Sequence, residues 1–229
     1  MQPVSQTRKK VSIAMKLIVI LSAATGIVMS AAAGRNTFMG GSRVFMYFTI
    51  QSNIAAALMS IAGGCYLLRK KAAGRIWRIV KLAITVSITL TGVVFAVLLV
   101  PILGRAAWSV PNTLTHLVVP LAAVADFFLV MPGAEMKKRN VIYVIIPPLL
   151  YAIYAGIGYV KGWEFAQGQI YPYFFLNWGS SAGAIGFTDE LPYMGCVWWI
   201  LALALFLIIV GLCYIAIAEK IGQRGRKEP

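Results

Sequence analysis

Long apolar runs, separated by short polar segments, alternate along the whole chain. A helix needs roughly 20 consecutive, mostly apolar residues to cross the hydrocarbon core of a bilayer. Six runs reach about that length, at positions 13–33, 44–68, 77–100, 112–131, 140–160 and 193–217. Because a backbone in lipid must satisfy its own hydrogen bonds, the pattern predicts an all-α integral membrane protein. We expect one domain, residues 1–229, formed by a six-helix transmembrane bundle.

Local sequence features add detail to this bundle. Pro120, Pro147 and Pro148 lie inside predicted spans, where we expect them to mark kinks. The first run also resembles a signal peptide, with a basic start, an apolar middle and the small residues 31–33 at its end. Because its apolar stretch is long enough to cross a bilayer, we expect an uncleaved first helix, whereas cleavage would leave five spans.

Composition supports a membrane protein over a nucleic-acid-binding one. The chain is 60% hydrophobic and 12% charged, whereas soluble domains are roughly 45–50% apolar. The net charge of +14 could indicate a nucleic-acid partner. However, the basic residues lie in short segments between apolar runs, and no soluble domain is left to bind a duplex. This distribution predicts contact with anionic membrane lipids and no nucleic-acid partner.

The distribution of Lys and Arg also predicts an orientation. One side of the predicted bundle carries most of them: Arg8, Lys9, Lys10, Arg69, Lys70, Lys71, Arg75, Arg78, Lys137, Lys138, Arg139, Lys220, Arg224, Arg226 and Lys227. The opposite side carries Arg35, Arg43, Arg105 and Lys161. Since cytoplasmic loops are enriched in basic residues, both termini are expected in the cytoplasm.

The single histidine, His116, is the first candidate for chemistry. It lies four residues into its predicted span, and Thr49 lies five residues into a span that enters from the same side. A titratable side chain inside the bilayer is a functional candidate by default. Imidazole can activate a threonine hydroxyl as a nucleophile, so the pair predicts ester cleavage if the two helices touch. The alternatives are a threonine bonded to its own helix or joining two helices, and a histidine that joins helices.

Polar neighbours on the same helices are candidates for supporting roles. Asn112, one turn before His116, could orient the imidazole through its side-chain carbonyl, or could simply cap the helix after Pro111. Asn53 or Ser52, close to Thr49 on its helix, or a backbone N–H near a kink, could stabilise an oxyanion.

An intramembrane acid, Asp126, supports a competing hypothesis. It lies ten residues after His116, roughly 15 Å along a helix, which is too far to orient the imidazole directly. It could be a proton or cation site, or could pair with Lys81. The first option fits a non-enzymatic protein that binds or transports a lipid or small solute. One histidine and three widely spaced cysteines predict no metal site and no cofactor.

The last external segment, about residues 161–192, is long and rich in aromatic residues. They are Trp163, Phe165, Tyr171, Tyr173, Phe174, Phe175, Trp178 and Phe187. Aromatic side chains favour the headgroup boundary of a bilayer, which predicts an interfacial belt. The alternative is a lid over an outward-facing pocket, and we expect a mixture of the two.

Four motifs occur together in a fixed order: Phe48-Thr49, then Asn112 with His116, then Asp126, then Tyr171-Pro172. This arrangement resembles the androgen-induced and androgen-dependent transmembrane hydrolases of animals. It is more similar still to their bacterial six-helix relatives, through segments 47–53 and 171–177, the latter ending at Asn177. The resemblance covers most of the chain from the second predicted helix onward.

The resemblance implies a threonine-dependent hydrolase without a metal, acting on an amphiphilic lipid such as a fatty acid ester of a hydroxy fatty acid. The positions that match the animal threonine and histidine are Thr49 and His116. It also implies the plasma membrane of a bacterium. The chain departs from the animal pattern in lacking additional histidines, in the polar run Gln51-Ser52-Asn53, and in the spacing from the histidine to Pro120. These departures leave the substrate lipid open.

Overall fold

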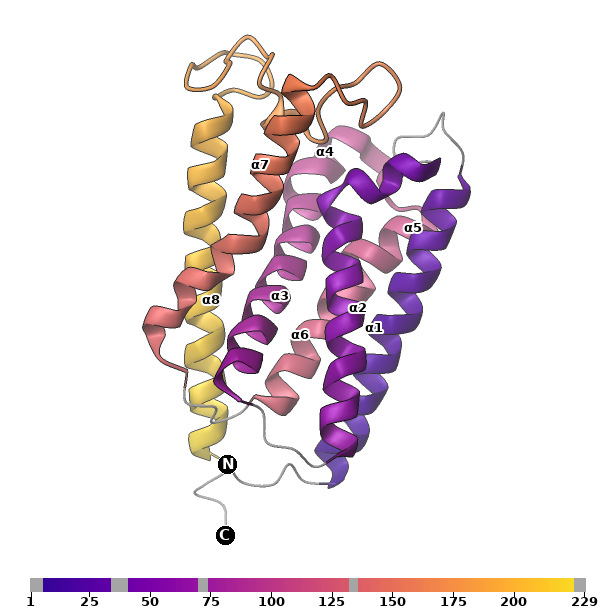
Figure 1. Ribbon diagram of the computed structural model, residues 1–229, viewed down its shortest axis with the longest axis vertical. Coiled ribbons are helices and arrows are strands. Elements are labelled where there is room, and N and C mark those ends of the chain that lie inside the picture. Colours follow the sequence, from indigo (N-terminus) through magenta and orange to yellow (C-terminus); the bar gives the residue numbers. More distant parts are fainter. Residues whose placement is uncertain (1–5, 34–40, 70–73, 132–135, 225–229) are drawn as a thin grey trace.

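The computed structural model describes residues 6–33, 41–69, 74–131 and 136–224 (Figure 1). Over these residues the fold is all-α with no β-strand, and six helices are long and apolar enough to cross a membrane. They span Gln6–Ala32, Phe48–Leu68, Arg75–Ala107, Val110–Val130, Lys138–Val160 and Cys196–Arg224. The predicted all-α fold and the predicted number of membrane-length helices are therefore confirmed.

Several of these long helices change type along their length. The first two are α1 (Gln6–Ala32) and α2 (Phe48–Leu68), with the 3-10 turn η1 (Gly41–Met46) before α2. The third consists of α3 (Arg75–Val94), η2 (Phe95–Leu99), α4 (Val100–Leu103) and η3 (Gly104–Ala107). The fourth consists of α5 (Val110–Thr113), η4 (Leu114–Val118) and α6 (Val119–Val130). The fifth consists of η5 (Lys138–Ile145) and α7 (Ile146–Val160), and η6 (Phe174–Leu176) precedes α8 (Cys196–Arg224).

The helices run side by side, with α3 contacting α2, α6 and α8 (Figure 1). On one side of α3, α1 packs against α2 and α6. On the other side, α8 packs against η5 and α3. The start of α1 and the end of α8 lie at the same end of the bundle, and the segment between α7 and α8 covers the opposite end. Five residues used to predict the orientation, Arg35, Lys70, Lys71, Arg226 and Lys227, lie outside the described residues.

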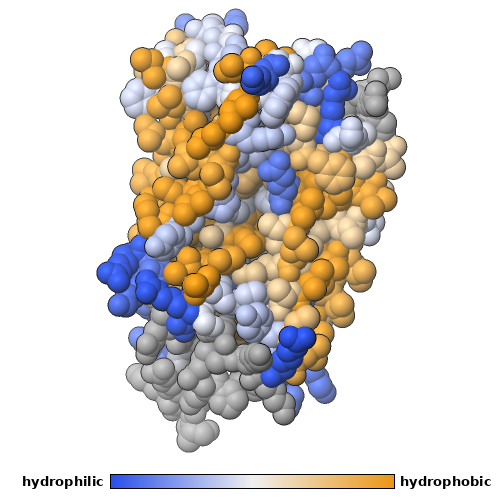
Figure 2. Space-filling view, in the orientation of Figure 1, coloured by the Kyte–Doolittle hydropathy of each residue, from blue (hydrophilic) through white to orange (hydrophobic). Residues whose placement is uncertain are grey.

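The outer surface is suited to lipid. Large apolar side chains that are more than half exposed are spread over the helices, including Leu21, Val28, Leu58, Leu121, Leu150 and Leu205. Figure 2 shows hydrophobic residues over much of the middle of one face and many hydrophilic residues nearer its ends. A soluble surface would rarely expose so much contiguous apolar area, so the surface supports an integral membrane protein.

Prolines explain where the helices change type. A proline has no N–H, so the carbonyl four residues earlier loses its helical partner. Before Pro101 the backbone widens into the π-turn η2, and before Pro120 it widens into the π-turn η4. Pro147 and Pro148 lie in the first turn of α7, where the 3-10 segment η5 ends. Each proline expected to mark a kink therefore lies at a change of helix type.

Candidate functional site

The structure brings Thr49 and His116 into contact. Thr49 Oγ1 lies 3.2 Å from His116 Nε2, although the two residues belong to α2 and η4. Both residues are buried, with 4% and 5% of their surfaces exposed. The sequence placed both at similar depth but could not show that their helices touch, and the structure brings them within hydrogen-bond distance.

Thr49 differs from other threonines of the bundle in its hydroxyl partner. Five of them donate their hydroxyl hydrogen to the carbonyl four residues earlier: Thr85, Thr89, Thr91, Thr113 and Thr115. Thr49 is the second residue of α2, so no α-helical turn precedes it. The sequence predicted that Thr49 lies deeper in its helix, because the residues of η1 were expected to belong to the same membrane span. Its hydroxyl is consequently free to donate to an imidazole nitrogen.

The partners of Nδ1 assign the tautomer of His116. Nδ1 lies 3.0 Å from the backbone carbonyl of Asn112, which can only accept. It also lies 3.1 Å from Thr115 Oγ1, whose own hydrogen is donated to the carbonyl of Pro111. A hydrogen on Nδ1 satisfies both contacts and leaves a lone pair on Nε2, directed to Thr49. The network thus holds the imidazole in the tautomer that a base needs.

The ring of His116 is fixed by Phe95. The two rings stack with centroids 4.0 Å apart and planes 22° apart. Each ring comes from a π-turn, and each π-turn precedes a proline, Pro101 or Pro120. Phe95 was not predicted from the sequence, and the available signal was weak: an apolar run with a proline six residues after the aromatic side chain.

The structure corrects the roles predicted for the polar neighbours. The Asn112 side chain does not reach the imidazole but donates to the carbonyl of Ala107 at 2.9 Å, and the backbone carbonyl of Asn112 takes its place. Asn112 is not the cap either, because Ser109 is the N-cap of α5. The side chains of Ser52 and Asn53 bond the backbone carbonyl of Thr49, and neither lines the pocket described next, so neither is an oxyanion donor.

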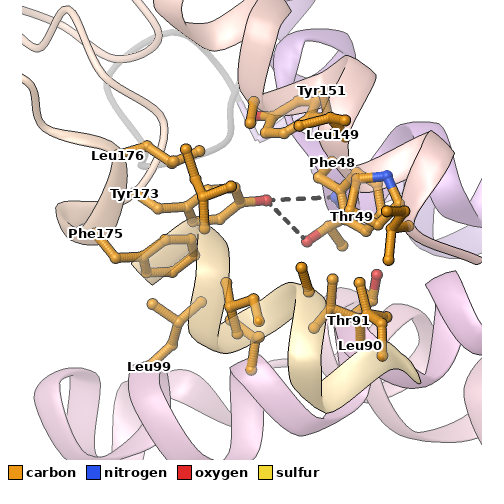
Figure 3. Close-up of a pocket in the computed structure, with 18 of the residues that line it drawn as sticks. Phe48, Thr49, Leu90, Thr91, Leu99, Leu149, Tyr151, Tyr173, Phe175 and Leu176 are labelled. Carbon is orange, nitrogen blue, oxygen red and sulfur yellow. Dashed lines mark hydrogen bonds between the residues drawn. The ribbon is translucent and has the colours of Figure 1, made fainter. Parts of the chain in front are cut away.

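An apolar pocket of about 770 Å³, counting its open mouth, lies beside the pair (Figure 3). Side chains from α2, α3, η2, η4, η5, α7, α8 and the segment around η6 line it. The polar members of the lining are Thr49, Thr91, His116, Tyr151 and Tyr173. Leu149 on α7 belongs to the lining and is 44% exposed on the outer surface, so the pocket reaches the apolar exterior of the bundle.

Tyr173 is a site residue that the sequence did not single out. Its hydroxyl lies 3.4 Å from both the Thr49 hydroxyl and the Thr49 backbone nitrogen (Figure 3). Burial raises the pKa of this phenol above its ordinary value of 10.0, so it keeps its hydrogen at neutral pH. It lies inside the 171–177 motif, and that membership was the available signal.

Other residues of that motif have structural roles outside the pocket. The carbonyl of Tyr171 accepts a hydrogen bond from the Gln169 side chain, Pro172 is buried, and the Asn177 side chain accepts one from the Gly179 backbone. The aromatic residues of this segment divide between buried and exposed positions, and Tyr173 and Phe175 line the pocket, whereas an interfacial belt stays a prediction. Phe165, Tyr173 and Phe175 are buried against Tyr47 and Tyr151, whereas Phe187 is 73% exposed.

Asp126 is fully buried and paired with two lysines. Its carboxylate bonds Lys81 Nζ at 2.6 Å, and it also bonds Lys16 Nζ. Ser12 Oγ donates a further hydrogen bond of 2.6 Å to it. Pairing with Lys81, one of the two options left open by the sequence, is confirmed, and the cluster joins α1, α3 and α6.

Comparison of the chain with models of protein families, with curated proteins and with solved structures gives no match. The family resemblance of the motifs therefore stays a prediction.

Proposed function

We propose that the protein is a membrane-embedded hydrolase that cleaves the ester of an amphiphilic lipid, with Thr49 as nucleophile and His116 as general base. The observation that supports this most directly is the hydroxyl–imidazole contact of 3.2 Å at the wall of an apolar pocket. A nucleophile, a base within hydrogen-bond reach and a third group that orients the base form the arrangement of nucleophilic hydrolases. Here the third group is the backbone carbonyl of Asn112.

The reaction proceeds in two steps. Thr49 Oγ1 attacks the acyl carbon while its proton passes to His116 Nε2, and the Asn112 carbonyl stabilises the imidazolium that forms. His116 then returns this proton to the leaving alcohol oxygen, which produces an acyl-threonine. In the second step His116 takes a proton from water, the hydroxide equivalent attacks the acyl carbon, and Thr49 regains its proton as the free acid departs.

The lining of the pocket indicates the class of substrate. Most of it is apolar, and its polar groups gather around Thr49 and Tyr173 at the end of the bundle covered by η6. A fatty-acyl chain fits such a lining, with its ester next to the polar groups. Because Leu149 connects the lining to the exterior, the substrate can enter sideways from the lipid.

The orientation and the family complete the proposal. We place both termini in the cytoplasm, on the basis of the basic residues, so that the pocket opens near the outer leaflet of a bacterial plasma membrane. The motif order supports membership of the bacterial relatives of the androgen-induced and androgen-dependent hydrolases. Single cysteines introduced at positions 6 and 187 test this orientation. We expect a thiol reagent that cannot cross the membrane to label position 187, but not position 6, when it is added to intact cells. Labelling of position 6 from outside would contradict it.

The activity can be tested on purified full-length protein in detergent, with a fluorophosphonate probe for labelling and p-nitrophenyl decanoate as the substrate. We expect labelling and turnover in the wild type, and loss of both in Thr49→Ala and His116→Ala. Thr113→Ala is the matched control because its hydroxyl bonds the carbonyl of Ser109 and lies outside the pocket. Equal turnover in all four proteins would overturn the proposal.

A further inference from the structure

The hydroxyl of Tyr173 occupies a specific place relative to the proposed nucleophile. It lies 3.4 Å from Thr49 Oγ1 and 3.4 Å from the backbone nitrogen of Thr49 (Figure 3). Its oxygen accepts the Thr49 N–H, because a backbone amide can only donate. The Thr49 hydroxyl hydrogen is directed to His116, so the hydrogen of Tyr173 points to the remaining lone pairs of Oγ1. Two donors, one O–H and one N–H, thus converge beside the attacking oxygen.

The N–H of Thr49 is available because of its place in the chain. It belongs to the first turn of α2, where amides have no intrahelical acceptor. Ile50 and Gln51, the next two residues, already donate to the carbonyl of Tyr47. The Thr49 amide is therefore directed to the Tyr173 hydroxyl and is positioned to donate to a substrate oxygen there.

Resting on the proposed hydrolase function, we propose that Tyr173 is a further catalytic residue that donates its phenolic hydrogen to the oxyanion, together with the backbone N–H of Thr49. When an ester enters, its carbonyl oxygen inserts between these two donors. As Thr49 Oγ1 bonds the acyl carbon, the carbonyl π electrons move to that oxygen, and both donors stabilise the charge. No proton leaves Tyr173, and the donors return to each other when the oxyanion collapses and the alcohol departs.

The surroundings of Tyr173 hold its ring in place. The ring stacks in parallel on Phe175, with centroids 5.1 Å apart and planes 2° apart. It meets Tyr47 edge to face at 5.9 Å. A donor on a ring fixed by packing needs no reorganisation when charge develops, which is the basis of electrostatic catalysis. Desolvation of the pocket strengthens the same interaction.

Tyr151 is the other phenol in the lining, and its bonding excludes it from this role. Its hydroxyl donates to the backbone carbonyl of Met46 at 3.1 Å. The hydroxyl of Tyr173 lies 3.4 Å from Thr49 Oγ1 instead, and it also interacts with the side chain of Tyr151. Since both rings belong to the same aromatic cluster, the difference lies in the partners of their hydroxyls.

The test compares Tyr173→Phe with the wild type in p-nitrophenyl decanoate hydrolysis, with Tyr154→Phe as the control. Tyr154 belongs to the same aromatic cluster but does not line the pocket. Loss of one oxyanion donor lowers kcat by about 10²–10³-fold in known hydrolases. We expect a fall in kcat of about 10²-fold for Tyr173→Phe, with KM changed by less than about threefold, and wild-type kinetics for Tyr154→Phe. An unchanged kcat, or a change confined to KM, would overturn the proposal.

An inhibitor series provides a readout that a structural role would not move. Thr49 Oγ1 can add to the carbonyl carbon of a decyl trifluoromethyl ketone, which forms an oxyanion. The corresponding alcohol has no carbonyl and cannot form one. Tyr173→Phe should weaken the ketone by about the same factor as kcat and leave binding of the alcohol unchanged. Equal weakening of both inhibitors would assign Tyr173 to packing.

Two unnatural residues keep the test valid if Tyr173→Phe unfolds. At position 173, 4-aminophenylalanine restores a donor and 4-fluorophenylalanine has nearly the same size without one. We expect the amino variant to be at least about tenfold faster than the fluoro variant, and equal rates would contradict the role. If the wild type itself shows no Thr49-dependent and His116-dependent turnover, the hydrolase proposal fails. If that turnover is present and survives in Tyr173→Phe, the role of Tyr173 alone fails.

Discussion

The backbone carbonyl of His116 lies against Gly92 of α3, so closely that a Cβ on Gly92 would be 2.9 Å from the carbonyl oxygen. This carbonyl is the one that Pro120 cannot engage, because proline has no N–H. The same hypothetical Cβ would meet the ring of Pro120 at 3.4 Å. The absence of a side chain at position 92 therefore sets how closely the π-turn with the proposed base approaches α3.

Gly92→Ala should displace η4 and lower activity. The atom in contact belongs to the backbone, which cannot move aside as a flexible side chain would. Overpacking of this kind costs about 1–3 kcal/mol, and a displacement of a few tenths of an ångström alters the contact between Thr49 and His116. We expect a lower Tm and a fall in kcat of at least about tenfold for p-nitrophenyl decanoate. Gly64→Ala is the control, since its Cβ would meet nothing within 4 Å.

The number of membrane-length helices and their approximate positions were readable from sequence because hydropathy and length are local properties. Helix type was less accessible. The sequence placed the start of the second span at residue 44, but α2 begins at Phe48 and a 3-10 turn precedes it. That difference matters, because it places Thr49 in the first turn, where its hydroxyl has no helical carbonyl to bond.

The members of the candidate site were predictable to different degrees. Thr49 and His116 were visible as polar residues in apolar runs. Their contact was not, because it depends on which helices are neighbours. The backbone carbonyl of Asn112 has no sequence signature at all, since every residue has a carbonyl. Tyr173 reaches the site through the fold of a long loop, and Phe95 through two π-turns that meet.

The proposed nucleophile can be tested by side-chain shape. Thr49→Val is nearly isosteric with the native residue but has no hydroxyl, so we expect kcat to fall by at least about 10³-fold while Tm changes little. Thr49→Ser keeps the hydroxyl but loses the methyl group that restricts χ1, and we expect activity within about tenfold of the wild type. Comparable activity in the serine and valine variants would argue against covalent catalysis at this position.

The role of Asn112 distinguishes the structure from the expectation drawn from sequence. If the side-chain amide oriented His116, the activity of Asn112→Ala would fall toward that of His116→Ala. Because the backbone carbonyl makes this bond, we expect a fall in kcat of less than about tenfold. The loss of the side-chain bond to Ala107 should lower the free energy of unfolding by about 1 kcal/mol. Steady-state kinetics and thermal unfolding in detergent measure the two effects.

Asp126→Asn should destabilise the protein more than removal of either of its lysine partners. The substitution leaves the ammonium groups of Lys16 and Lys81 buried, each 4% exposed, without a counter-ion. Breaking a buried ion pair in this way costs about 3–5 kcal/mol. Lys81→Met leaves one cation paired with one carboxylate, so we expect a smaller fall in Tm, or none.

Asp126 lies outside the lining of the pocket, so the folded fraction of Asp126→Asn should keep its kcat. A variant that keeps its Tm and hydrolysis but loses solute movement in proteoliposomes would instead favour transport coupled to Asp126.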